Sequence, residues 1–409
     1  MSFWGFFENS VFYGNNVVTL QAVSFIYISQ TRIMNKRLFS FIGVAFAAAV
    51  AFAQGGTVAE TAGTSASRGY FNHLDIAVTA GTTGFGLDLE MPVGKSVSVR
   101  TGFTFVPSMF SDMQLGIQIG DDNVSQAEQN QKFDKMASFV EQYLGTKIDR
   151  YIQMERKPNF NNFKLLVDVH PLRNKNWFVT GGFYWGPSTI ARAENAAIDG
   201  TSLVGVTMYN KFYDAAKNDV PVYGNAYLDP DLAEKLLRNG RMSVHLGNFK
   251  NQYEYEMEYE TDFEGNPMLD GSGNPIVRRD DDGNPVVRVD ANGNPVVKVD
   301  ANGNPLHKAY RLVPDDNNMV KARLKVNSFR PYLGFGYGGA LSKKSDMCHI
   351  YVSCGAMFWG GTPKLYTHDG VDLINDVENI GGSIGNNVRF FKKFKFFPVL
   401  ELRLAHKIF

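Results

Sequence analysis

Ionisable side chains recur on one face of segments in which polar and apolar residues alternate. The face carries His73, Asp75, Asp88, Glu90, Arg100, Lys164, Asp168, His170, Glu401, Arg403 and Lys407. These are five acids, four bases and two histidines, so they can pair with one another inside a common interior. Removing one partner of such a buried pair would leave the other charge buried and unpaired, which is strongly destabilising. We therefore predict a charge network that fills a lumen, with a narrow ion or proton path or a gated pore as the functional alternative.

Catalytic and metal-binding chemistry are not predicted. We recognise no Ser-His-Asp or paired-carboxylate arrangement. We interpret His368 and Asp369 as a solvated pair in a long loop. Asp290, Asn292 and Asn294 offer oxygen atoms for calcium. However, an EF-hand loop has glycine at its sixth position, where this chain has Pro295. We expect no catalytic residue, no metal and no cofactor.

The elements that must position the charged face are strands, because side chains alternate across a strand with period two. Eight segments alternate in this way: 70–80, 85–91, 97–105, 163–169, 177–185, 333–337, 347–359 and 400–408. An even number of strands lets both chain ends lie on the same side of a membrane barrel.

The connections between these segments differ in length on the two sides. Short turns at 92–94, 173–176 and 342–346 alternate with one short connection at 81–84 and three long ones at 107–158, 188–318 and 361–394. Short turns on one rim and long loops on the other are typical of outer-membrane barrels. We predict an all-β, transmembrane, antiparallel up-and-down β-barrel of about eight strands. Segments within 108–119 and 241–260 also alternate, and we interpret them as strands that extend above the membrane. Ten strands are possible if these segments join the barrel instead, which would widen it.

The two ends of the sequence carry export and assembly features. Residues 34–53 have a charged start, an apolar run and a small-x-small cleavage site, which predicts a signal peptide. Residues 1–33 are then expected to be a mis-annotated upstream extension, residues 54–69 a flexible leader and residues 70–409 the barrel with its loops. The closing strand has one apolar face and is predicted to be the C-terminal assembly signal, formed by Leu400, Leu402, Leu404, Ile408 and Phe409.

The long loops are expected to form a cap rather than loose tails. Apolar residues in 126–154 have helical spacing, and 229–238 reads as a short helix. Gly-Asn-Pro recurs with a ten-residue period in the best copies within 265–307, which predicts a run of β-turns and small strands. We interpret this repeat as a variable arm of the longest loop.

Aromatic side chains near the predicted strand ends have the positions of a membrane-interface girdle. They are Trp177, Trp185, Tyr337, Phe358 and Trp359. Girdles of aromatic residues at both interfaces are expected of membrane barrels.

Four segments carry a family resemblance. They are 167–171 (VDVHP), 329–338 (FRPYLGFGYG), 359–366 (WGGTPKLY) and 397–409 (FPVLELRLAHKIF). They resemble a family of poorly characterised outer-membrane β-barrel proteins common in genomes of Gram-negative gut anaerobes. The resemblance covers about 70–106, 159–190 and 319–409. It implies a fold and a location in the outer membrane, and it transfers no catalytic residues.

Together these patterns predict a non-enzymatic outer-membrane barrel with a filled lumen and an extracellular loop cap for surface binding, adhesion or envelope integrity. The expected partners are outer-membrane lipids, the barrel-assembly machinery and an unknown extracellular ligand. Equal counts of Lys+Arg and Asp+Glu, 41 each, give no reason to expect nucleic acid. A small pore or transport component and a soluble secreted β-sandwich remain as alternatives.

Overall fold

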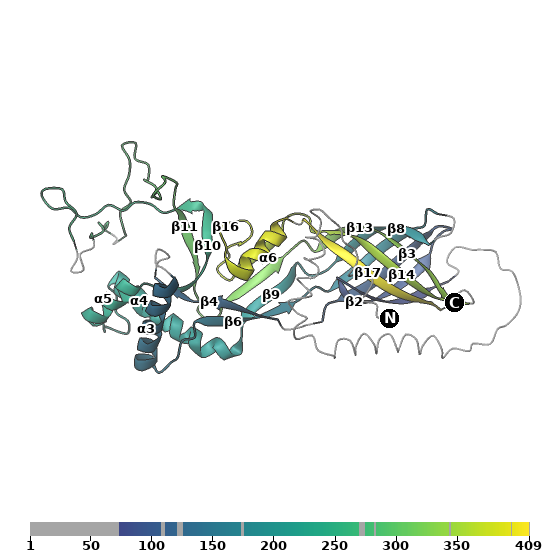
Figure 1. The fold of residues 1–409 in the computed structure, drawn as a ribbon, viewed down its shortest axis with the longest axis horizontal. Coiled ribbons are helices and arrows are strands. Elements are labelled where there is room, and N and C mark those ends of the chain that lie inside the picture. The colour runs from purple at the N-terminus through teal and green to yellow at the C-terminus, as the bar shows by residue number, and fades with distance from the viewer. Residues whose placement is uncertain are drawn as a thin grey trace, which may run out of the picture.

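The computed structural model describes residues 73–107, 111–120, 126–172, 176–269, 275–281, 284–342, 345–393 and 395–408. The predicted upstream extension, signal peptide and leader lie outside the described residues, as does Phe409. The molecule is elongated, with a β-barrel at one end, a second sheet beyond it, and helices and a thin arm at the other end (Figure 1).

Eight antiparallel strands close into a barrel in the order β1-β17-β14-β13-β8-β7-β3-β2. Their bounds are β1 Asp75–Gly81, β2 Gly84–Pro92, β3 Val97–Phe105, β7 Asn162–Val169, β8 Trp177–Trp185, β13 Phe329–Ser342, β14 Ser345–Phe358 and β17 Phe396–Lys407. These are the eight strands predicted from alternation. Closure joins the first strand to the last, with Asp75 opposite Lys407. We call this end of the barrel the terminal end and the opposite end the loop end.

The two segments proposed as extra barrel strands lie outside the barrel. Strand β4 (Ser111–Gly116) pairs with β6 (Tyr151–Pro158). Strand β10 (Met242–Tyr253) pairs with β11 (His307–Leu312), β16 (Val377–Glu378) and β5 (Gln118–Ile119). The ten-strand alternative is therefore wrong. The sandwich alternative is wrong as well, because the eight strands form one closed barrel.

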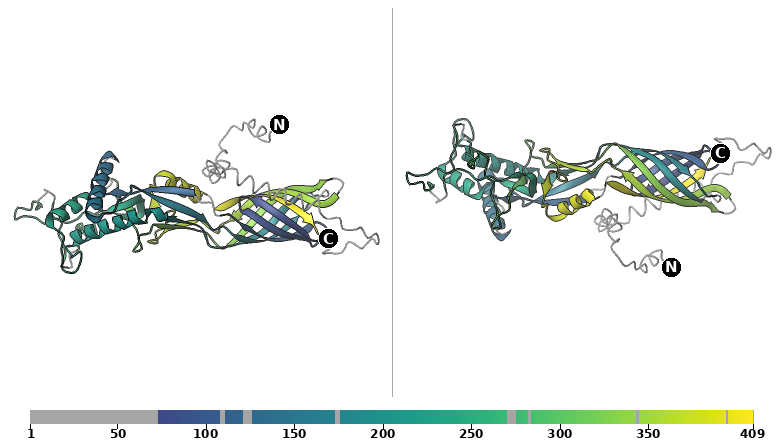
Figure 2. Two further views of the ribbon diagram at one scale, coloured as in Figure 1. Left: turned by 90° about the horizontal axis from the view of Figure 1, so that it is seen from below. Right: turned by 90° about the horizontal axis from the view of Figure 1, so that it is seen from above.

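Five barrel strands have continuations beyond the loop end, and these form a second sheet with the order β15-β12-β9-β6-β4. The remaining members of this extension sheet are β9 (Thr189–Asn195), β12 (Lys321–Lys325) and β15 (Lys364–Thr367). Their order repeats that of the barrel strands β14-β13-β8-β7-β3, each of which is the nearest barrel strand in sequence. Figure 2 shows the extension sheet following the barrel along the long axis in both views.

The helices lie mainly beyond the extension sheet. They are α3 (Gln126–Leu144), α4 (Gly200–Asn218), α5 (Pro230–Asn239) and α6 (Gly382–Lys393), with a 3₁₀ turn η2 at Ala197–Asp199. Helices α3 and α5 match the predicted helical segments, but the expected helix at 126–154 ends ten residues early. Gly145 follows α3 with φ +65°, a left-handed conformation that ends a helix. Residues 151–154 belong instead to β6.

The Gly-Asn-Pro arm is a series of hairpins joined to a central segment, 254–260. Each junction is a ring of three backbone hydrogen bonds. In one ring Glu254 donates to Leu306 (2.9 Å), Leu306 to Lys298 (2.8 Å) and Lys298 to Glu254 (2.8 Å). The same ring recurs at Glu256, Glu258 and Glu260. The predicted Val-Val-Lys/Arg-Val strands are reduced to single bridges, such as Met257 with Val287.

Candidate functional site: the barrel lumen

The barrel has opposite polarity on its two faces. Its outward side chains are large, apolar and exposed, and they form an apolar belt of Ile76, Val78, Leu87, Leu89, Phe103, Phe105, Phe163, Leu165, Val167, Val169, Trp177, Val179, Trp185, Phe329, Leu333, Phe335, Tyr337, Val352, Phe358, Leu400 and Leu402. The inward side chains include charged groups that are almost completely buried. Strand alternation thus directs the apolar set outward and the charged set into the lumen.

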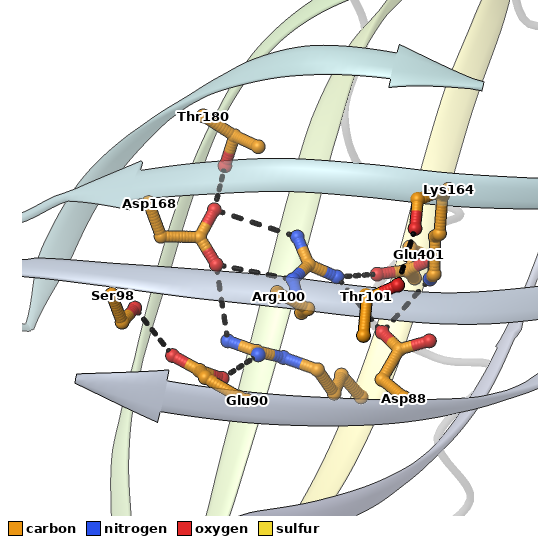
Figure 3. Close-up of polar contacts among 10 residues, drawn as sticks. Asp88, Glu90, Ser98, Arg100, Thr101, Lys164, Asp168, Thr180 and Glu401 are labelled. Carbon is orange, nitrogen blue, oxygen red and sulfur yellow. Dashed lines mark hydrogen bonds and ion pairs between the residues drawn. The ribbon is translucent and has the colours of Figure 1, made fainter. Parts of the chain in front are cut away.

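Arg100 of β3 lies at the centre of the charged network (Figure 3). Its Nε lies 3.1 Å from Asp168 Oδ2, and its Nη1 lies 3.1 Å from Asp88 Oδ2 and 2.6 Å from Glu401 Oε1. Only 1% of Arg100 is exposed, so these carboxylates replace the water that its guanidinium would otherwise bind. One arginine therefore links β2, β7 and β17 across the lumen.

Lys164 of β7 binds two of the same carboxylates. Its Nζ lies 2.6 Å from Glu401 Oε2 and 2.9 Å from Asp88 Oδ2. Glu401 consequently has one oxygen on Arg100 and the other on Lys164. Because each charge has partners on different strands, the network joins strands that are far apart in the sequence.

Arg403 of β17 extends the network toward the terminal end. Its Nη1 binds Glu90, and its Nη2 lies 3.9 Å from Asp168. The guanidinium carbon also lies 4.1 Å from the ring centre of Tyr351, within the range of a cation–π interaction. Neutral hydroxyls complete the set, because Ser98 donates to Glu90 (2.7 Å) and Thr180 donates to Asp168 (2.5 Å).

The structure brings together seven of the eleven predicted lumen residues: Asp88, Glu90, Arg100, Lys164, Asp168, Glu401 and Arg403. The other four lie near the terminal end. Asp75 is buried there, with an oxygen 3.8 Å from His73 Nε2, and faces Lys407 in the strand register. His170 is half-buried, with its ring 5.6 Å from that of Phe178.

Large rings that sequence reasoning missed fill the space around the network. A Cβ added at Gly336 would lie 2.3 Å from Phe178 Cζ, and one at Gly334 would lie 2.3 Å from the Tyr332 hydroxyl. Inward glycines on β13 thus leave room for side chains from β8 and from β13 itself. The available signal was the alternation of glycine with Leu333, Phe335 and Tyr337. It indicates inward positions that have no side chains of their own and leave space for large rings from other positions.

The loop end of the lumen is closed by a second cluster, around Arg330. Its Nε donates to the Asn327 carbonyl (2.7 Å), its Nη2 to the Pro187 carbonyl (2.5 Å) and its Nη1 to the Asn162 side chain. The guanidinium carbon lies 5.3 Å from the ring centre of Phe160. Arg330 is fully buried and links the β12–β13 and β8–β9 connections to the start of β7, where the barrel ends. The sequence analysis did not select it.

Trp359 does not belong to the outer aromatic girdle, contrary to prediction. Only 4% of it is exposed, and its ring packs 5.4 Å from Phe397 and 6.3 Å from Phe160. It follows β14, and its backbone N–H bonds the Lys395 carbonyl at 3.3 Å, so it helps to close the loop end of the lumen. Four predicted girdle residues are exposed on the outer face: Trp177, Trp185, Tyr337 and Phe358.

The predicted assembly-signal residues lie on or after β17. Leu400 and Leu402 belong to the apolar belt, and Leu404 is half-buried. Ile408 is 52% exposed beyond the end of the strand. Phe409 lies outside the described residues, so the structure places four of the five.

Both ring nitrogens of His368 contact the backbone. Nε2 contacts the Val313 carbonyl at 2.9 Å, and Nδ1 accepts from the Lys321 N–H at 3.3 Å. The neighbouring Asp369 carboxylate accepts from Tyr310 at 2.8 Å. These bonds hold the loop in place, which is a structural role.

The segment 381–385 (GGSIG), which the sequence analysis overlooked, matches the Gly-x-Ser-x-Gly pattern of hydrolase nucleophiles. It lies where α6 begins. A nucleophile elbow strains the serine itself, whereas here the positive φ angles fall on Gly382 (+61°) and Asn379 (+56°). Ser383 is exposed, and within the described part of the chain it has no hydrogen bond to a histidine. The motif therefore lacks the geometry of a nucleophile.

The acidic side chains of the arm's turns accept hydrogen bonds from the backbone of their own turns. Asp290 Oδ1 accepts from the Asn292 and Asn294 N–H groups at 2.8 and 2.9 Å. Asp300 makes the equivalent bonds to Asn302 and Asn304. No cluster of three or more His, Cys, Asp or Glu side chains suited to a metal occurs among the described residues.

No helix in the described ranges combines the length and apolar character needed to span a membrane.

A closed antiparallel barrel with an apolar exterior and an ion-paired interior is the fold of a transmembrane β-barrel. No family model matches the chain, and no curated protein matches it either. The crystal structure of Acinetobacter baumannii CarO2 is similar at 12% identity and a TM-score of 0.31, covering 83% of this chain and 100% of that one. Acinetobacter baumannii CarO follows at 12% identity and a TM-score of 0.28, covering 82% and 97%.

A major outer membrane protein from Thermus thermophilus is also similar, at 9% identity and a TM-score of 0.23, covering 82% of this chain and 98% of that one. Scores this low carry no inference about function. The fold class rests on the closed barrel itself, and the resemblance to barrels of gut anaerobes stays a prediction.

Proposed function

We propose that this chain is a non-enzymatic outer-membrane β-barrel that anchors a large extracellular head, with surface binding, adhesion or envelope integrity as its role. The observation that carries the proposal is the inverted polarity of the barrel. Soluble proteins rarely expose apolar patches larger than a few hundred Å², and a closed barrel satisfies all of its backbone hydrogen bonds internally, as a bilayer requires. Outer-membrane lipids and the barrel-assembly machinery are the partners this location requires.

The loop lengths support the orientation of the proposed barrel. Short turns join β2 to β3 and β7 to β8 at the terminal end, whereas the extension sheet, helices and arm all lie beyond the loop end (Figure 1). Bacterial membrane barrels place short turns in the periplasm and long loops outside the cell. The head would therefore face the surroundings and contact the unknown ligand.

The filled lumen favours an anchor over a pore. An eight-stranded barrel has an interior just wide enough for side chains. Here ion pairs occupy its middle, Phe178 and Tyr351 lie toward the terminal end, and Tyr184 and Tyr332 lie toward the loop end with their rings 5.4 Å apart. Ions would have to displace these groups in order to pass.

Cell fractionation tests the location, and intact-cell proteolysis tests the orientation. The protein should enter the outer-membrane fraction and migrate differently on an SDS gel before and after boiling. Protease added to intact cells should cut the arm and leave the barrel whole. Recovery in the soluble fraction without a heat-dependent shift would refute the barrel anchor. Cleavage only after the cells are opened would reverse its orientation.

A further inference from the structure

The outer surface of the molecule changes chemistry where the barrel gives way to the extension sheet. On the barrel side, Trp185 and Phe329 lie opposite each other and are 60% and 56% exposed. A few residues further out, the extension sheet packs Met154, Ile190 and Leu324 inward. Its solvent face carries charged side chains instead. The apolar belt therefore ends at this boundary, which is where the bilayer surface would lie under the function proposed above.

The first two rows of side chains beyond that boundary are basic. Strand register places Lys325 of β12 opposite Lys364 of β15. In the next row Arg323 of β12 lies opposite Arg192 of β9, and Arg192 lies opposite Lys157 of β6. We call these five residues the basic belt. Acids on this face, such as Glu155 and Glu194, occupy the following row, further from the barrel.

Like charges directly opposite each other on neighbouring strands are destabilising, and three such pairs occur here side by side. Lys157 is compensated by Glu155 and Glu194, at 3.4 and 3.5 Å. Arg192, Arg323, Lys325 and Lys364 form no ion pair with any carboxylate of the described residues. The belt is a local excess of positive charge on a chain whose charged residues balance, 41 against 41.

We propose that the basic belt binds the phosphate groups of anionic lipids in the outer leaflet. An anion seated between opposed cations would relieve their repulsion, and arginine forks match phosphate oxygens in geometry. The belt lies directly beyond the exposed aromatic residues at the loop end, at the level expected for headgroups. This inference rests on the proposed membrane location and adds the class of lipid that the protein selects.

Lipid selectivity of the reconstituted full-length protein tests the inference. The protein is placed in phosphatidylcholine vesicles with a trace of spin-labelled phosphatidic acid or spin-labelled phosphatidylcholine, and the fraction of immobilised label is measured. A cation near a membrane surface contributes about 1 kcal/mol. We therefore expect the native protein to favour phosphatidic acid by about fivefold. High salt should reduce the preference, because the Debye length falls to about 3 Å at 1 M.

A quadruple variant isolates the belt: Arg192→Gln, Arg323→Gln, Lys325→Gln and Lys364→Gln. Its control removes the same charge from exposed helical lysines outside the extension sheet: Lys135→Gln, Lys211→Gln, Lys217→Gln and Lys235→Gln. The belt variant should lose the preference and bind both labels alike. The control should keep it. Equal preference in the belt variant and the native protein would overturn the inference.

Three further outcomes identify other failures. Inorganic phosphate that abolishes the preference, where chloride at the same ionic strength does not, would indicate a site for the free ion and overturn the lipid assignment. Protein that does not float with vesicles of any composition would refute the proposed membrane function and this inference with it. Protein that floats but shows no preference would refute the lipid selectivity alone.

Discussion

Gly336 shows how single residues set the packing of the lumen. Its missing Cβ leaves room for the Phe178 ring, which would lie 2.3 Å from an added methyl carbon. We expect Gly336→Ala to lower the free energy of unfolding by about 1–3 kcal/mol, the usual cost of overpacking. Gly181→Ala is the matched control, because nothing lies within 4 Å of its added Cβ. Urea unfolding in detergent micelles measures both variants, and an equal effect in the two would contradict a packed lumen.

Glu401 is the carboxylate that bridges the two central cations of the lumen network. Its two oxygens bind Arg100 and Lys164, both at 2.6 Å. Glu401→Gln would leave these cations with one carboxylate fewer in a buried site, at a cost of about 3–5 kcal/mol. Lys407→Gln removes a charge from the same barrel outside the network and should cost much less. A Glu401→Gln barrel that unfolds at the native urea concentration would show that the network contributes little.

The ion pairs could not be predicted individually from the sequence. Alternation identifies the inward face of each strand, but Arg100 and Glu401 are 301 residues apart and meet only through barrel closure. Arg330 was missed because it lies in a segment where glycine and aromatic residues dominate the pattern. Trp359 was misplaced because a ring at a strand end can pack inward over the lumen as readily as outward.

At the scale of elements, each arm turn is held by an aspartate that accepts its own turn's N–H groups. Bonds from the Asn304 side chain and backbone hold the pKa of Asp300 below its ordinary value of 3.8. Bonds from the Asn294 and Asn292 backbone do the same for the pKa of Asp290. Because the folded-state pKa is lowered, the carboxylate's contribution to the stability of the folded turn is complete at pH values above its ordinary pKa of 3.8. The contribution is lost as the pH falls through the folded pKa.

Acid should therefore loosen the arm turns. Hydrogen exchange of the Asn302 and Asn304 amides, normalised to intrinsic rates, should lose protection as the pH falls below 3.8. Asp300→Ala should show the same loss at neutral pH, whereas Asp281→Ala, an exposed carboxylate in the same arm, should not. Protection that is unchanged by both acid and Asp300→Ala would mean that the hairpin hydrogen bonds hold the turns without the carboxylate.

The elements that could be predicted from the sequence are those with one apolar and one polar face, because the two environments leave a periodic pattern in the residues. All eight barrel strands were predicted because lipid-facing and lumen-facing positions must alternate. Helix α4 was not, since Gly200 and Gly205 lie within it and its stability depends on tertiary contacts. One such contact is the pair of 2.9 Å bonds between Asn210 and the Met242 backbone. Of the extension strands, β4 lies within the alternating segment noted at 108–119, whereas β6, β9, β12 and β15 were not predicted.

At the scale of the whole molecule, the barrel and the extension sheet that follows it have opposite polarity. Inside the barrel, charge lies inward and apolar side chains lie outward. In the extension sheet, apolar side chains lie inward and charge lies outward. The matching strand order on the two sides of this boundary couples the barrel to a head with a buried apolar core. Under the proposed function, it would hold the head in a fixed geometry relative to the membrane anchor.

The most direct test of the account is the current through a planar bilayer that contains the purified full-length protein. Insertion is verified in parallel by flotation with vesicles of the same lipid. A lumen filled by the Arg100 network and closed by the Arg330 cluster should give no stable conductance steps above the bare bilayer. Uniform, long-lived steps from inserted native protein would contradict the account and identify the barrel as a small pore.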